Sequence, residues 1–292
     1  MKEATTIDKQ IEILIKRGMA MDEGNEKAKE YLSDIGYFRL GFYCFPFEKT
    51  YPATDNRTHE YKEGSKISDV VKLYYLDVDL RYILIKYINR IEVNFRTNLI
   101  YLASNTFIES NTWFADNLFI DKDFVDKVLK IYKDIVKNKV LREHHERYKN
   151  DIYAPAWKTL EFLTFGIIVK LYKNIKDTSV KQKIAGVYDI TNVKTFENYI
   201  SAIVEIRNAC AHGSVLFDLK LDKSLKNSPV VIKGNNRQNL YSAIRVIGFI
   251  LGQISQNRKE DMRKDITAKF DEYKSNEIIK ELIKNSIGYT YP

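Results

Sequence analysis

With 292 residues, 45% of them hydrophobic and 29% charged, the chain has the composition of a soluble globular protein that can bury a substantial core. The chain has only 5 Pro and 12 Gly, and this low content favours long helices over a turn-rich β protein. No apolar run approaches the roughly 20 residues of a membrane span. The formal net charge of +8 suits a polyanionic partner, although an ordinary lysine-rich surface carries such a charge as well.

Two short helices are predicted at the amino end, over about residues 6–17 and 25–35. A glycine follows each of them and serves as its stop, Gly18 and Gly36. Six aromatic residues then crowd residues 37–47 around Arg39. Such a group either stacks RNA bases or forms a satellite core, and the core is the commoner arrangement. Residues 48–65 are expected to be an exposed loop.

The longest helical pattern, residues 66–103, is predicted to be two helices or one kinked helix at the centre of a bundle. Its apolar positions keep a three- and four-residue spacing: Leu84, Ile88, Ile91, Phe95, Leu99 and Leu102. Glu92 and Arg96 lie four residues apart on the flank of this stripe. They form a structural ion pair, or else Glu92 or Glu161 orients an arginine of a neighbouring helix; the sequence leaves both open.

A basic stretch follows. A helix over about residues 121–149 places apolar side chains on one side and four lysines on the other: Lys127, Lys130, Lys133 and Lys137. Lys170 and Lys173 add positive charge near the end of the next predicted helix, about residues 155–174, in which Pro155 suits the first turn. A solvated face is the usual meaning of such a run, and contact with an RNA backbone is the sharper hypothesis.

The next predicted helix, about residues 191–212, ends in a cluster of polar side chains that can bind phosphate and transfer protons. Its apolar positions form one stripe: Val193, Phe196, Ile200 and Val204. On a helical wheel Arg207 falls inside this stripe, while Asn208 and His212 share one flank of it. Because a guanidinium keeps its proton, an arginine on a core-facing stripe needs an anion, a dipole or a partner subunit.

Beyond His212 the helical pattern breaks. Residues 213–236 are predicted to form a long loop or a short hairpin, and helices resume at about residues 237–256 and 260–284. The chain is therefore predicted to be all-α. We divide it into an N-terminal helical and aromatic-rich region (1–65), a helical core (66–217), and a loop or hairpin with C-terminal helices (218–292), packed together as one unit.

No cofactor or metal site is predicted. The two cysteines, Cys44 and Cys210, are too few for a disulfide framework or a metal site, and we expect both to be reduced and buried. His144 and His145 are adjacent, so on a helix they diverge by about 100° and make poor joint metal ligands. Because the amino terminus is polar and resembles no secretion signal, we expect a cytoplasmic protein.

The side chains of Arg207, Asn208 and His212 suit the cleavage of RNA without a metal ion. That reaction needs a base for the ribose 2′-hydroxyl proton, cationic donors for the phosphorane-like transition state, and an acid for the leaving 5′-oxygen. Histidine titrates near neutral pH and can do either proton transfer, and the arginine fork matches phosphate oxygens. Asparagine can orient the phosphate or the imidazole.

An arginine followed after four residues by a histidine also resembles the active-site motif of the HEPN superfamily, helical proteins that include many metal-independent ribonucleases. More narrowly, the chain resembles the Abi family of abortive-infection phage-resistance proteins. Three blocks within about residues 6–217 carry this resemblance. They are residues 10–47 with Ile35-Gly36-Tyr37-Phe38-Arg39-Leu40, residues 73–96 with Asp79-Leu80-Arg81 and Arg90-Ile91-Glu92-Val93-Asn94-Phe95-Arg96, and residues 155–166 followed by Arg207-Asn208 and Ala211-His212.

The resemblance implies a HEPN-type bundle in which two subunits pair through their motif helices. The composite cleft of such a homodimer holds two copies each of Arg207 and His212, which would explain why Arg207 lies on an apolar stripe. It further implies a toxin-like ribonuclease in anti-phage defence, restrained in some members by a small non-coding RNA. One departure is that many members follow the motif histidine with a second histidine and a tryptophan-containing stretch, whereas here residues 213–217 read Gly-Ser-Val-Leu-Phe.

Two other functions stay open at this point. The chain is a non-catalytic RNA-binding or scaffold protein in a defence complex, if the motif only holds phosphate. It is a purely structural helical dimer module, if Arg207 pairs with Glu92 or Glu161 and His212 caps its own helix.

Overall fold

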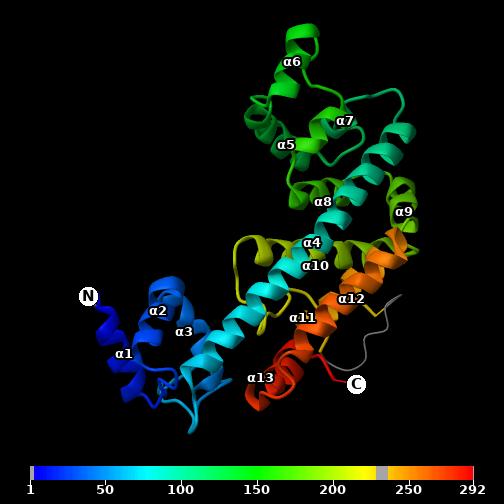
Figure 1. Cartoon of the computed structure of the whole chain (residues 1–292). Coiled ribbons are helices and arrows are strands. Elements are labelled where there is room, and N and C mark those ends of the chain that lie inside the picture. Colours follow the sequence, from blue (N-terminus) through cyan, green and yellow to red (C-terminus); the bar gives the residue numbers. More distant parts are fainter. Residues whose placement is uncertain (1–2, 228–235, 292) are drawn as a thin grey trace. The chain divides into compact units, whose positions relative to one another are not determined.

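The computed structural model describes residues 3–227 and 236–291, and over these residues the regular structure is helical (Figure 1). Thirteen α-helices and no named strand occur in the described part of the chain; pairing between extended segments is limited to isolated bridges. The predicted all-α class is confirmed. None of the helices in these two ranges combines the length and the apolar character that crossing a membrane requires.

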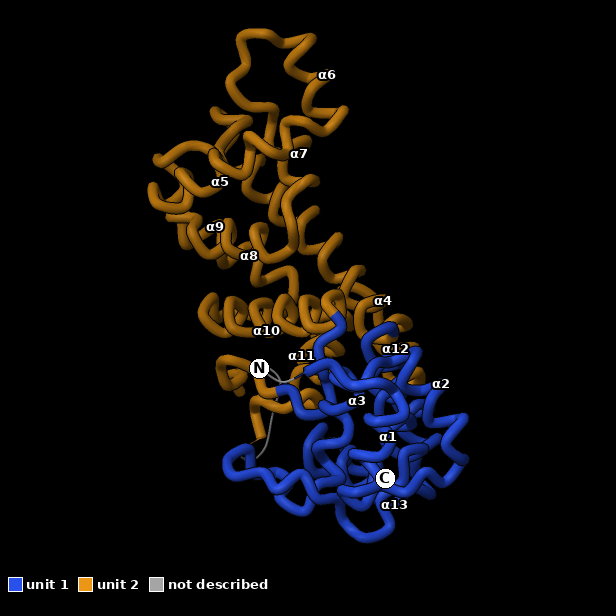
Figure 2. The backbone as a smooth tube through the Cα atoms, turned by 90° about the vertical axis from the view of Figure 1, so that its left-hand side faces the viewer, with its two compact units in different colours: residues 1–82, 213–219, 266–292 blue, residues 83–212, 220–265 orange. Residues whose placement is uncertain are grey.

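The chain forms two compact units, each assembled from segments that are distant in sequence (Figure 2). Unit 1 contains residues 1–82, 213–219 and 266–292, and unit 2 contains residues 83–212 and 220–265. Helix α4 (Ile67–Thr106) contributes its first part to unit 1 and its remainder to unit 2. The three stretches proposed from the sequence follow chain order instead and stay a prediction.

In unit 1 the first two helices begin and end where the sequence predicts. Helix α1 (Ile7–Lys16) is capped at its amino end by the Thr6 side chain, which accepts a hydrogen bond from the Lys9 amide, and helix α2 (Asn25–Ile35) follows. Gly18 and Gly36 after these helices have φ of +96° and +85°, values that favour glycine over any other residue.

The aromatic stretch after Gly36 is a helix, which the sequence reading did not identify. Helix α3 (Tyr37–Cys44) and the short 3₁₀ turn η1 (Phe45–Phe47) bury Tyr43 and Phe47, as a satellite core requires, but leave Phe38 82% exposed. The prediction of an exposed loop over residues 48–65 is wrong for Glu48, Tyr61 and Ser65, which are buried.

Helix α4 is one continuous helix of 40 residues rather than the two helices allowed by the sequence. Its predicted apolar positions are buried except for Leu102, which is half-buried. In unit 2 its side chains meet an aromatic cluster of buried rings: Phe95, Phe165, Tyr172, Tyr188 and Phe196. Around this cluster α10 (Val193–Ala211) packs against α8 (Phe165–Lys173), α9 (Thr178–Gly186) and α11 (Leu240–Ile254).

Three helices predicted as single elements are divided in the structure. Residues 121–149 form α5 (Lys122–Ile135) and α6 (Lys139–Arg147), because Asn138 leaves the helical conformation and caps α6 with its side chain. Residues 155–174 form α7 (Ala156–Thr159), η3 (Leu160–Phe162) and α8, with extended backbone between the last two.

The C-terminal helix is also divided, into α12 (Gln256–Asp271), α13 (Glu277–Leu282) and the π-helical turn η4 (Ile283–Ile287). Asn276 caps α13, so the backbone has left the helix before it. The stretch after His212 is without helix or strand over residues 213–227, and the β-branched run at residues 230–232, on which the hairpin alternative rested, lies outside the described residues.

Candidate functional site

The polar motif lies at the carboxyl end of α10. The helix ends at Ala211, His212 is its C-cap, and the His212 amide donates to the Asn208 carbonyl over 2.9 Å. Gly213 follows with φ of +66°, in the left-handed region that commonly ends a helix. Asn208 and His212 are exposed, so both polar side chains are available to a ligand.

Arg207 finds its anion on α4. Its Nε lies 3.4 Å from Oε2 of Glu92, whose side chain is largely buried, while the Arg207 side chain is 30% exposed. No hydrogen bond or ion pair of the two Arg207 terminal amino groups occurs among the described residues. The need for a partner that the apolar stripe indicated is therefore met within the subunit, and the outer end of the guanidinium fork is left available.

The same carboxylate serves a second arginine. Oε1 of Glu92 accepts a hydrogen bond from Nη2 of Arg96 over 3.0 Å, and this Nη2 also donates to the Leu163 carbonyl over 2.9 Å. Glu161, 53% exposed, lies 3.8 Å from Nη1 of Arg96 and forms no ion pair with Arg207. Both proposed roles of Glu92 thus occur together, whereas among the described residues the ion pair of Glu161 is with Arg96.

Replacing Glu92 with glutamine is expected to destabilise this cluster. Arg207 would then lose its ion pair and Arg96 would keep only the longer ion pair with Glu161, and charge-assisted hydrogen bonds of this kind are worth about 1.5–3 kcal/mol. For a chain of this size we expect the melting temperature to fall by roughly 3–10 °C. The matched control is Glu161→Gln, which removes an exposed and longer contact and should shift melting by no more than a degree or two; an equal shift in both variants would contradict the assignment.

The predicted lysines are divided between different places in unit 2. Lys127, Lys130 and Lys133 are exposed along α5, while Lys137 lies beyond the end of that helix and pairs with Asp134. Lys170 is exposed and Lys173 is half-buried near the end of α8. Of these, Lys173 lines the same groove as Asn208, a groove of about 640 Å³.

That groove also contains lysines that the sequence reading missed, namely Lys194, Lys223 and Lys226. Lys194 is detectable in principle, because it shares a helical face with Asn198, Ser201 and Asn208. Lys223 and Lys226 follow the motif in a stretch without periodicity, and only the tertiary structure brings them to this face.

Two arginines of the resemblance blocks hold the chain just after the motif, in unit 1. Arg39 donates through Nη1 to the Gly213 carbonyl over 2.8 Å, and Arg81 donates through Nη1 to the Ser214 carbonyl over 3.1 Å. Both arginines belong to the blocks that carry the family resemblance, and their role is not evident from the sequence. Their family pattern was the available signal, and the structure shows that they fix backbone positions of the segment that follows α10.

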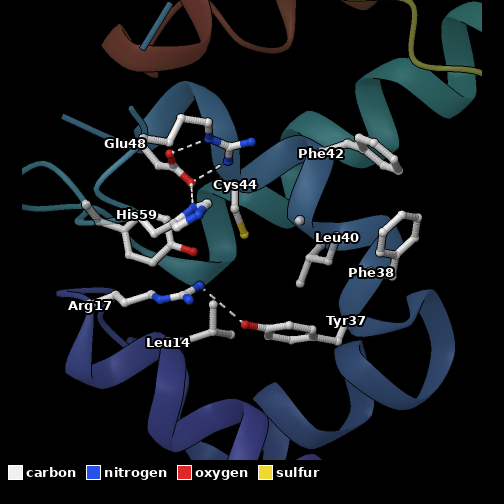
Figure 3. A pocket seen from close by; sticks show the side chains of 12 residues that line it. Leu14, Arg17, Tyr37, Phe38, Leu40, Phe42, Cys44, Glu48 and His59 are labelled. Atoms are coloured by element: carbon white, nitrogen blue, oxygen red, sulfur yellow. Dashed lines mark hydrogen bonds and ion pairs between the residues drawn. The ribbon is translucent and has the colours of Figure 1, made fainter. Parts of the chain in front are cut away.

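A second pocket lies within unit 1 and has a volume of about 220 Å³ (Figure 3). Arg17, Tyr37 and Phe38 are among its lining residues, and Arg17 donates to the Tyr37 hydroxyl over 3.5 Å. Glu48 at its side accepts two hydrogen bonds from Arg57, at 2.9 and 2.6 Å. The stacking of RNA bases on these aromatic side chains stays a prediction.

The electrostatics of this pocket are those of a structural cluster. Burial acts to raise the pKa of Glu48, but the hydrogen bonds and positive charges of Arg57 and His59 bring it below its usual value. Cys44 is a free and buried cysteine, as the sequence predicts, and burial raises the pKa of its thiol to about 12. Cys210 is half-buried rather than buried.

Comparison with models of protein families gives a match over most of the chain. The family model described as "Abi-like protein" matches residues 30–218, about two thirds of the chain. The matched range contains the ion-pair cluster of Glu92 and the motif from Arg207 to His212. No curated protein and no solved structure matches the chain.

Proposed function

We propose, from the premise that this chain belongs to the Abi-like protein family, that it is a metal-independent endoribonuclease of the HEPN type acting in abortive-infection defence against phage. The observation that carries the proposal is the arrangement at the end of α10. Arg207 is oriented by Glu92 through Nε while its terminal amino groups remain available, and Asn208 and His212 are exposed within the next five residues.

In the proposed reaction the ribose 2′-oxygen attacks the adjacent phosphorus and the bond from phosphorus to the 5′-oxygen breaks. The products are a 2′,3′-cyclic phosphate and a free 5′-hydroxyl. Arg207 donates hydrogen bonds to the non-bridging oxygens, where negative charge grows in the transition state. His212 performs a proton transfer, and Asn208 orients the phosphate or the imidazole.

The proposed active species is a homodimer formed through the ends of two α10 helices. One subunit supplies one motif histidine, whereas the reaction needs both a base and an acid, so two copies of His212 complete the site. The exposure of Asn208 and His212 leaves room for this arrangement. Sedimentation of the protein, alone and with RNA, tests the dimer: a species that stays monomeric in both conditions would count against it.

The direct test of catalysis uses purified protein stripped of nucleic acid and incubated with total RNA in EDTA. Cleavage that leaves cyclic-phosphate ends supports the nuclease.

Because an unrestrained ribonuclease is toxic, we also propose that the protein is a toxin-like component held in check until infection, with a small non-coding RNA as the restraining partner. Sequencing the nucleic acid removed during purification tests that part.

The second candidate is a non-catalytic RNA-binding or scaffold protein, which the lysine-lined groove beside Asn208 favours. A His212→Ala variant separates the two functions. Loss of cleavage with unchanged RNA affinity supports the enzyme, and an equal loss of affinity and biological function supports the binding protein. A purely structural module predicts instead that Arg207→Ala chiefly lowers the melting temperature.

A further inference from the structure

One face of α10 forms the floor of a groove that runs along the helix to the motif. Side chains at helical spacing line it from Lys194 through Asn198 and Ser201 to Asn208, a rise of about 21 Å. Lys173 of α8 and the loop of residues 222–226 complete the lining. The groove therefore reaches the residue next to Arg207.

The loop is fastened to α10 by hydrogen bonds to its backbone. The Asn198 side chain donates to the Ser224 carbonyl over 3.2 Å and accepts from the Lys226 amide over 2.9 Å. Glu205 accepts from the Asp222 amide over 3.0 Å. These bonds hold the backbone of the loop lysines in place, so binding a ligand there does not require the loop to be ordered first.

Lys173 is a half-buried cation without a neutralising charge. Its Nζ donates to the Ser201 hydroxyl, and no carboxylate of the described residues lies within ion-pair distance of it. Burial lowers the pKa of this amine; Glu197 opposes the shift, and Lys223, Lys194 and Lys170 add to it. An ammonium group in such surroundings is stabilised when an anion binds.

Acidic side chains also line the groove, but two of the three are engaged in holding the structure. Glu197 pairs with Lys181 and Lys194, at 3.5 and 3.0 Å. Glu205 accepts a hydrogen bond from the loop backbone, and burial raises the pKa of its carboxyl group. The cations left without a carboxylate partner among the described residues are Lys173, Lys223 and Lys226.

We propose that this groove binds the sugar–phosphate backbone of a single-stranded RNA segment and leads it to Arg207, an inference that rests on the proposed nuclease function. Lysine, asparagine and serine side chains are the groups that contact phosphates and sugars. No aromatic side chain is among the lining residues, so the groove offers no platform for stacking bases. Binding there is therefore electrostatic and tolerant of sequence.

The test measures affinity for a fluorescent RNA oligonucleotide carrying 2′-O-methyl groups, which cannot be cleaved by 2′-hydroxyl attack. With full-length protein, the double variant Lys223→Glu with Lys226→Glu should bind at least tenfold more weakly. The slope of log affinity against log salt should fall in magnitude by about 1.4, since each lost contact to a single strand accounts for about 0.7. The matched control is Lys264→Glu, an exposed lysine of α12 in the same unit, which should leave both values unchanged.

A second variant, Lys173→Met, separates binding from stability. Because burial disfavours the charge of Lys173, its removal should leave the melting temperature unchanged or raise it, while RNA affinity falls severalfold. If Lys173 had only a structural role, the Lys173→Met protein would be less stable and would keep the RNA affinity of the wild type.

Unchanged affinity and salt slope in the double variant would overturn the proposal that the groove binds RNA. A loss of affinity confined to the variant Lys127→Glu with Lys130→Glu on α5 would also overturn it. Different results would contradict the proposed groove and the proposed nuclease. Wild type that binds through the groove but leaves ordinary RNA intact in EDTA overturns the nuclease alone. If the wild-type protein cleaves RNA while the double variant retains wild-type affinity, only the proposal for the groove is overturned.

Discussion

Replacing His212 with alanine is expected to reduce RNA cleavage in EDTA by about 10²–10⁴-fold, the usual contribution of a general acid or base. His212 is exposed, and its side chain forms no hydrogen bond, ion pair or ring contact among the described residues, so the substitution should not alter the fold. Affinity for the 2′-O-methyl oligonucleotide should therefore stay within a factor of two or so of wild type. Initial rates on a labelled RNA, with analysis of the product ends, provide the measurement.

The matched control is His145→Gln, which changes the imidazole that contacts the Tyr132 hydroxyl over 2.8 Å on another part of unit 2. We expect it to cleave at nearly the wild-type rate. If His212→Ala cleaves as fast as His145→Gln, the activity belongs to other residues or to a contaminant, and the proposed catalytic set is wrong.

The largest loss of stability is expected for Asp77→Ala, in unit 1. Asp77 is fully buried on α4 and accepts hydrogen bonds from the Tyr43 hydroxyl at 2.9 Å and Arg81 Nη1 at 2.8 Å. It also accepts from the backbone amides of Leu216 and Phe217. Removing the carboxylate leaves the largely buried guanidinium of Arg81 without its negative partner and two backbone amides without their acceptor, which costs about 3–5 kcal/mol.

We expect the Asp77→Ala protein to melt about 6 °C lower or more, by the usual conversion for chains of this size. Hydrogen exchange at Leu216 and Phe217 should accelerate, because their amides lose their acceptor. Asp79→Ala is the matched control two residues along the same helix. Asp79 is partly exposed and pairs with Lys269 over 2.9 Å, so its loss should cost no more than about 1 kcal/mol. Equal melting of the two variants would show that the Asp77 network does not stabilise unit 1.

The Asp77 network bears on the motif because it holds the segment that follows α10. Asp77 binds the amides of Leu216 and Phe217, while Arg39 and Arg81 bind the carbonyls of Gly213 and Ser214. Carbonyls and amides of this segment are thus bound by three charged side chains of unit 1. The family resemblance pointed to Arg39 and Arg81 as characteristic residues, and these contacts give them a physical role.

Elements whose limits depend on neighbouring residues could be predicted from the sequence. Thr6, Gly18 and Gly36 mark the ends of α1 and α2, and Gly213 marks the end of α10, because a cap acts within one turn of the helix. The predictions of a single helix over residues 121–149, 155–174 and 260–284 were wrong for a related reason. Hydrophobic spacing continues across a break, so periodicity alone does not reveal where the backbone leaves the helix.

The sequence by itself determined that the chain is helical, that Arg207, Asn208 and His212 gather at the end of one helix, and that Arg207 needs an anion. Only the tertiary structure decided that the anion is Glu92 rather than Glu161, and that Lys173, Lys223 and Lys226 join Asn208 in one groove. The physical reason is the distance along the chain. Helix formation and capping depend on residues within a few positions, whereas an ion pair between α4 and α10 depends on how the whole of unit 2 packs.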